Sequence, residues 1–146
     1  MTNSSDPCLL LHSHELPVVD RGAGVKTTPL VGKWNCQHNA VTTGTTTFEP
    51  GKSIPLHYHN VEETVMVIAG AGQVTMGEET FDVKAGDVTW VPAGVHHNFS
   101  NTGDGVMTIY WVYGGRDVTR TIVATGETFE HLSEADRTLS TGNAGP

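Results

Sequence analysis

Residues 51–70 contain two histidines and a glutamate whose spacing allows them to act together. Successive side chains of a strand point to opposite faces, so His57 and His59 share one face while Tyr58 points away. The same alternation places Glu63 on the face of the two histidines. Imidazole and carboxylate groups together form a ligand set that first-row transition metals favour. The spacing therefore predicts a metal site on one face of this strand.

A second stretch, residues 86–101, offers a further ligand. It reads as a short strand that Pro92 ends, because proline has no N–H to donate to a sheet. Gly94 then permits a sharp backbone turn that directs the following residues back toward the first strand. The next polar side chains are His96 and His97, and the residues alone leave both open as the fourth ligand.

The spacing within these two stretches resembles the two signature motifs of the cupin superfamily. The matching positions are Gly51, His57, His59, Glu63 and Gly70 in the first motif, and Gly86, Pro92, Gly94, His97 and Asn101 in the second. The motif spacing selects Glu63 over its neighbour Glu62, and His97 over His96. Asn101 is expected to bond backbone groups in a turn.

This resemblance implies an all-β fold, namely a single-domain antiparallel β-barrel of the double-stranded β-helix or jelly-roll type. It also implies one divalent transition metal per chain, held by His57, His59, Glu63 and His97. Three imidazoles and one carboxylate leave two positions of an octahedron open, which favours catalysis over a closed structural site. We expect Fe(II), with Mn(II), Ni(II) or Zn(II) as alternatives.

The ligand set alone permits several functions, because cupins share a fold and differ in chemistry. The leading interpretation is an Fe(II)-type dioxygenase acting on a small enolic, phenolic or carboxylate metabolite. The first alternative is an isomerase, cyclase or lyase that uses the metal as a Lewis acid. The second is a non-catalytic cupin that binds a small molecule.

Few other side chains are candidates for the site. His96 is considered as an acid or base behind the ligands, and Tyr110 as a residue of the cavity wall. Some small cupin lyases carry a tyrosine two residues after the metal-binding glutamate, where this chain has Val65. The cations that could hold an anionic substrate are few, and each is expected at the surface. They are Lys52, Arg116 and Arg120.

The remaining chain divides into three parts. Residues 1–30 are expected to form an N-terminal lead and arm, residues 31–125 the barrel, and residues 126–146 a tail. Residues 133–136 have the spacing of a capping box, which predicts a short helix in that tail. Residues 64–68 are apolar at both parities, which predicts that a further sheet or a second subunit covers the outer face. A homodimer is therefore expected.

Composition limits the classes of partner. The chain has 16 acidic and 8 basic residues and a net charge of −8, with no basic cluster to neutralise phosphates. Neither nucleic acid nor an anionic membrane is expected as a partner, which leaves a small-molecule substrate. With only two cysteines and no apolar leader near the N-terminus, a reducing, cytoplasmic location is expected.

Overall fold

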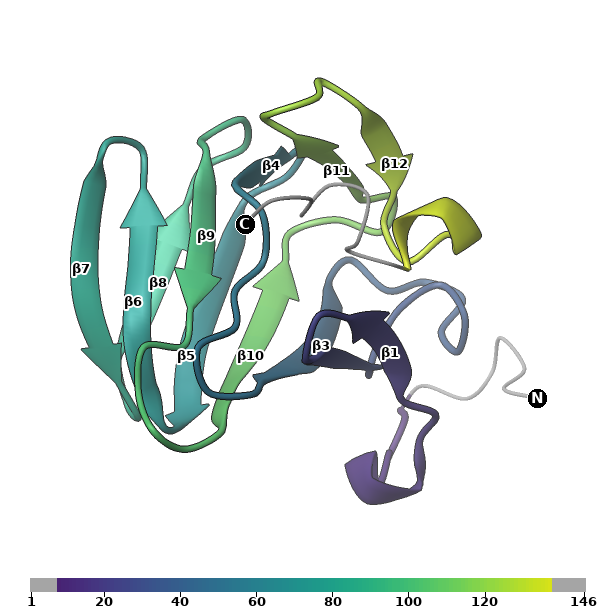
Figure 1. Ribbon diagram of the computed structural model, residues 1–146. Coiled ribbons are helices and arrows are strands. Elements are labelled where there is room, and N and C mark those ends of the chain that lie inside the picture. Colours follow the sequence, from purple (N-terminus) through teal and green to yellow (C-terminus); the bar gives the residue numbers. More distant parts are fainter. Residues whose placement is uncertain (1–7, 138–146) are drawn as a thin grey trace.

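Two six-stranded sheets make up the molecule in the computed structural model, which describes residues 8–137 (Figure 1). Strand order is β1-β2-β3-β10-β5-β8 in the first sheet and β12-β11-β4-β9-β6-β7 in the second. The strands are β1 (Val19–Gly22), β2 (Val25–Pro29), β3 (Thr42–Phe48), β4 (His57–His59), β5 (Glu63–Ala69), β6 (Ala71–Met76), β7 (Glu79–Lys84), β8 (Val88–Val91), β9 (His97–Ser100), β10 (Met107–Tyr113), β11 (Thr119–Ile122) and β12 (Thr128–Glu130).

All the strand pairs are antiparallel, and many neighbours within a sheet are distant in sequence. For example, β10 lies between β3 and β5, and β9 lies between β4 and β6. This exchange of strands between two facing sheets is the jelly-roll form of the antiparallel β-barrel. The predicted all-β fold is confirmed.

The apolar core lies between the two sheets. On β5 the side chains of Val65 and Val67 are buried, and Glu63 is buried on the same face. The core residues are Val25, Phe48, Val65, Val67, Val74, Val83, Phe99, Met107, Ile109, Trp111, Tyr113 and Val118. The alternation that buries the valines of β5 therefore also brings the predicted metal-binding carboxylate into the barrel.

Both ends of the described chain take part in the sheets. The expected N-terminal arm contains the β1–β2 hairpin, and β2 pairs with β3 along the edge of the first sheet. At the other end, β11 joins the metal strand β4 to β12. The N- and C-terminal segments consequently close the part of the barrel that lies beyond β3 and β4.

Helical structure within residues 8–137 is limited to two short 3-10 helices, η1 (Ser13–Glu15) and η2 (Glu134–Asp136). The predicted tail helix corresponds to η2, but the Ser133 side chain does not cap it. Instead, Asp136 accepts a hydrogen bond from the backbone N–H of Leu132, 2.8 Å away. Within the described part of the chain, no helix is long and apolar enough to cross a membrane.

The outer face of β5 is exposed in the single chain. Met66 is 42% exposed and Ile68 is 48% exposed. The expectation that another sheet of this chain covers them is wrong for the residues described, because neither sheet packs on this face. Cover by a second subunit stays a prediction.

Substitution of Gly70 tests the importance of the tight turn between β5 and β6. Gly70 has φ +81°, and a Cβ atom there would collide with the carbonyl oxygen of Val106. We expect Gly70→Ala to lower the free energy of unfolding by about 2–5 kcal/mol, the sum of left-handed strain and overpacking. Gly77 is the matched control, because it has φ +63° with open space around it. Gly77→Ala should cost only about 1–2 kcal/mol in denaturant titrations. Equal losses would contradict the predicted collision.

Candidate metal centre

Three buried histidines meet inside the barrel. They come from the paired strands β4 and β9 (Figure 1). His57 and His59 alternate with Tyr58 along β4, and both are buried. His97 begins β9 and lies directly opposite His57 in the antiparallel pair. One ring nitrogen from each of the three lies within 4.8 Å of the others. The structure thus brings together the three histidines that were predicted as ligands.

Backbone carbonyl groups fix the orientation of all three rings. The Nδ1 atom of His57 lies 2.7 Å from the Pro55 carbonyl oxygen, and that of His97 lies 2.8 Å from the Val95 carbonyl oxygen. The Nδ1 atom of His59 lies 3.0 Å from the carbonyl oxygen of Thr119 on β11. A carbonyl can only accept, so Nδ1 carries the proton in each ring. The Nε2 atoms are left to bind a ligand in their shared space.

Glu63 completes the predicted set, but it reaches the histidines from β5 in the opposite sheet and not from their own strand, as had been predicted. Its Oε1 atom lies 2.9 Å from Nε2 of His97 and 3.8 Å from Nε2 of His59. His97 therefore faces two acceptors, a carbonyl at Nδ1 and a carboxylate at Nε2. Although burial opposes it, the hydrogen bond and charge of Glu63 raise the pKa of His97 above its usual value. When its ring is protonated, His97 therefore forms an ion pair with Glu63.

The other two histidines are neutral. Burial holds the pKa of His57 well below its usual value, and it lowers the pKa of His59 to about 4 despite the nearby charge of Glu63. The Nε2 atom of His59 is buried and has no hydrogen-bond partner among the described residues. Such an atom is costly unless a ligand satisfies it. The donor types and this unpaired nitrogen fit a divalent metal ion held by His57, His59, Glu63 and His97.

A small cavity of about 40 Å³ borders the histidines. Apolar side chains of Ile54, Phe99 and Ile109 form part of its wall. The polar wall contains Thr46, Trp111, Tyr113, His131, Arg21 and Arg120, besides the metal ligands. A water molecule needs roughly 10–15 Å³ of such space, so the cavity admits an ion and a small polar group.

Tyr113 and His131 form a polar pair in this wall. The Tyr113 hydroxyl lies 3.3 Å from Nε2 of His131, and the rings are 4.9 Å apart. Burial and the charge of Glu63 raise the pKa of Tyr113 well above its usual value, so the phenol keeps its proton. Burial and the proximity of His59 hold the pKa of His131 well below its usual value. Both groups are therefore neutral hydrogen-bonding partners for a ligand.

The remaining sequence candidates lie away from the cavity. His96 is exposed and its ring stacks on that of Tyr58, 5.3 Å away. Side chains alternate along β10, so Tyr110 points outward while its neighbours Ile109 and Trp111 point into the barrel. Glu62 is exposed and accepts a hydrogen bond from the Trp90 indole. The structure therefore does not bring His96 or Tyr110 to the cavity.

Arginine placement differs from the sequence-based expectation. Arg120 was expected at the surface, but it is only 5% exposed and lines the cavity. Lys52 is exposed, and Arg116 bonds the carbonyl oxygen of Cys36 away from the cavity. Arg21 was not considered, yet it is buried beside Arg120.

Sequence reasoning also missed Tyr113 and His131. The parity of β10 carries a usable signal for Tyr113, because Met107, Ile109 and Trp111 form an apolar series that continues to it. No comparable signal points to His131 or Arg21. Their position depends on how the terminal segments close the barrel.

Comparison with known families agrees with this geometry. Residues 44–113 match the family model described as the cupin domain. Residues 44–113 are therefore a cupin domain. The match begins in β3 and ends with β10, so it includes all four predicted metal ligands. It does not include the segments that contain Arg21, Arg120 and His131.

Curated relatives are similar over part of the chain. Protein SchB of Streptomyces halstedii is 39% identical over 62 residues, which cover 42% of this chain and 45% of SchB. Polyketide synthase CurC of Streptomyces cyaneus is 37% identical over 62 residues, which cover 42% of this chain and 40% of CurC. The matches thus span less than half the length of these relatives.

Solved structures share the fold. An RmlC-like cupin from Shewanella frigidimarina has a TM-score of 0.62 at 21% identity, covering 73% of this chain and 90% of the other. Oxalate decarboxylase from Bacillus subtilis has a TM-score of 0.68 at 24% identity, covering 76% of this chain and 30% of the other. These likenesses support the jelly-roll assignment.

Metal content tests the ligand assignment. We expect about one divalent ion per chain, and His59→Ala or His97→Ala should weaken metal affinity by more than roughly 100-fold, because loss of a ligand exceeds loss of a supporting partner. Elemental analysis after dialysis provides the measurement. His96→Ala and Glu62→Gln are matched controls and should retain the ion. Full occupancy in His97→Ala with loss in His96→Ala would refute the assignment.

The pH dependence of metal binding tests the His97–Glu63 ion pair. His97 has a raised pKa in the ion-free fold, so it holds an extra proton below that pKa. An ion must displace this proton, and affinity should fall by about tenfold per pH unit once the pH drops below the pKa of His97. Competition titrations with a chelator between pH 5 and 9 should show that metal affinity begins to fall at a pH above the usual histidine pKa of about 6.5. An affinity independent of pH would contradict this.

Proposed function

We propose that this protein is a metal-dependent enzyme, a dioxygenase that acts with Fe(II) on a small enolic, phenolic or carboxylate compound. The observation that supports this most is the convergence of three imidazoles and one carboxylate beside a small cavity. Four protein donors are fewer than the six of an octahedral shell, and the set contains no thiolate. Structural zinc sites commonly use four ligands that include cysteine.

The protein's own groups would prepare the substrate. When bound, the ion supplies a Lewis acid and, as Fe(II), a reductant for dioxygen. Phe99 and Ile109 form an apolar part of the cavity wall, and such low-dielectric surroundings strengthen the polar interactions beside them. The Tyr113 phenol can donate a hydrogen bond to a substrate oxygen. Its neighbour His131 is neutral and can donate or accept a second hydrogen bond. These groups would orient an oxygen-rich substrate beside the histidines.

A second candidate function is a Lewis-acid isomerisation, cyclisation or lyase reaction. The similarity to polyketide synthase CurC favours it, because poly-β-carbonyl chains close rings through enolates without consuming oxygen. The same cavity groups would stabilise an enolate in either reaction. The two functions differ in whether dioxygen is a reactant.

Reaction class can be decided with a panel of small enolic, phenolic and carboxylate compounds. The Fe(II) protein should consume one dioxygen per product and place both atoms of ¹⁸O₂ in the product. The Zn(II) protein is the control and should be inactive with the same compounds. Turnover that persists without oxygen and with Zn(II) would replace the dioxygenase with the Lewis-acid reaction. Binding without turnover in either atmosphere would indicate a non-catalytic cupin.

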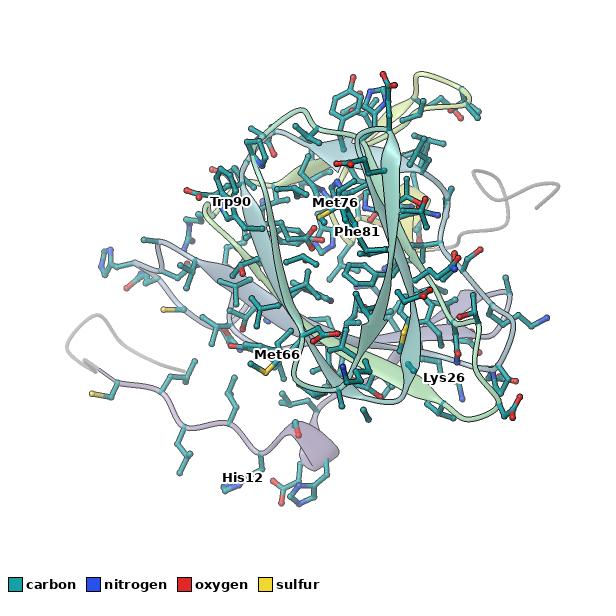
Figure 2. The ribbon with its side chains drawn as sticks, turned by 90° about the vertical axis from the view of Figure 1, so that its left-hand side faces the viewer. His12, Lys26, Met66, Met76, Phe81 and Trp90 are labelled. Carbon is teal, nitrogen blue, oxygen red and sulfur yellow. The ribbon has the colours of Figure 1, made fainter. Side chains whose placement is uncertain are left out.

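We also propose that two copies associate through the outer face of β5 and β8. Met66 lies opposite Val88 in this strand pair, so both side chains share one face. Trp90 on the same edge strand is 59% exposed (Figure 2). A contiguous exposed apolar surface on a sheet edge is typical of a protein–protein interface.

Oligomeric mass tests this association. Light scattering of the intact chain at micromolar concentration should give twice the chain mass. Met66→Asp should shift it to the monomer, because a carboxylate would be buried at the interface. Phe81→Asp on β7 is the control, since Phe81 is similarly exposed on the other sheet (Figure 2). A monomeric wild type would remove the proposal.

A further inference from the structure

We propose that Arg120, held in position by Arg21 and Asp136, binds the anionic group of the substrate beside the metal centre. This inference rests on the proposed function and narrows its substrate class to small carboxylates and enolates. None of these three residues lies within the matched cupin domain.

Strand register directs Arg120 into the barrel. On β11, Arg120 lies directly opposite His59 of β4, and Ile122 lies opposite His57. Directly opposed residues of an antiparallel pair project from the same face of a sheet. The Arg120 side chain therefore enters the space that contains the histidine rings, and it lines the same cavity as His57, Glu63 and His97.

Asp136, near the C-terminal end of the described residues, forms ion pairs with both arginines. Its Oδ1 atom lies 2.7 Å from Nε of Arg120, and its Oδ2 atom lies 3.5 Å from Nη2 of Arg21. Asp136 is fully buried, and the Leu132 N–H donates a further hydrogen bond to it. This carboxylate on η2 holds the two guanidinium groups against the cavity.

The two arginines differ in the donors they have left. Arg21 donates from Nε to the Arg137 carbonyl, from Nη1 to Thr27 and from Nη2 to the Asp136 carbonyl. Arg120 uses Nε for Asp136, and its Nη2 lies 3.5 Å from the Asp136 carbonyl oxygen. Among residues 8–137, Nη1 of Arg120 has no acceptor. Arg21 is thus a positioning residue, and Arg120 retains donors for a ligand.

Charge balance shows which ligand this arrangement favours. Two buried guanidinium groups share a single carboxylate, which leaves one positive charge uncompensated inside the barrel. Burial and the like charge of Arg120 lower the pKa of Arg21 to about 10. An uncompensated buried charge is unfavourable, so an anion that binds in the cavity would be stabilised by neutralising it. The cavity of about 40 Å³ restricts that anion to a small group.

Calorimetric titration with malonate tests this subsite, and malonamide serves as the uncharged ligand of the same shape. We expect the Zn(II)-loaded wild type to bind malonate at least about tenfold more tightly than malonamide. Arg120→Gln should weaken malonate binding by about 10- to 100-fold, as expected for a charge-assisted hydrogen bond, and retain the ion. Arg116→Gln removes the same charge outside the cavity and should leave malonate affinity unchanged.

The outcomes separate this inference from the proposed function. Unchanged malonate affinity in a folded, metal-loaded Arg120→Gln protein would overturn the subsite and leave the metal centre intact. If the wild type binds no ion, the proposed function fails, and the same titration of ion-free protein still tests Arg120. Should Arg120→Gln not fold, the guanidinium NMR resonances of the wild type decide. Malonate should shift those of Arg120, and the absence of a shift would overturn the subsite.

Discussion

The arrangement depends on hydrogen bonds that three imidazole Nδ1–H groups donate to backbone carbonyls. Two of these carbonyls precede their histidine by two residues, Pro55 before His57 and Val95 before His97. The third belongs to Thr119, on the strand that pairs with β4. Because the acceptors are backbone atoms, the ring orientation follows from the fold itself. The backbone that forms the strand pairs thus also orients the three rings. With their Nδ1 atoms bonded to carbonyls, the three Nε2 atoms remain available for a shared ligand.

This constraint has a cost that the rest of the barrel offsets. The Nε2 atom of His59 is buried without a partner, which costs about 1–3 kcal/mol in the ion-free protein. The other buried polar groups have partners, because Glu63 accepts a hydrogen bond from His97 and Asp136 pairs with both Arg21 and Arg120. The apolar core between the sheets supplies the compensating stability. A polar centre of this kind persists because each group except the ligand-binding atoms has a partner.

The amino-acid sequence predicted the parts of this protein that depend on local spacing. Strand alternation was sufficient to place His57 and His59 on one face of β4, and the motif spacing distinguished His97 from His96. Alternation along a single strand was wrong for Glu63, because the chain leaves β4 after His59 and Glu63 begins β5 in the opposite sheet. The cavity wall was not predictable in the same way. Arg21 lies on β1 and Arg120 on β11, and these strands come together with Asp136 only in the folded barrel, so their spacing in sequence carries no signal. Tyr113 differs, because the apolar parity of β10 favours it over Tyr110.

The most direct test of this account is X-ray absorption spectroscopy of the Zn(II)-loaded protein. The proposed ligands predict a first shell without sulfur, containing three imidazole nitrogens and carboxylate or water oxygens at about 2.0–2.2 Å. The multiple-scattering signal should correspond to three imidazoles and fall to two in His97→Ala. A first shell with a thiolate ligand, or with fewer than three imidazoles in the wild type, would contradict the central claim.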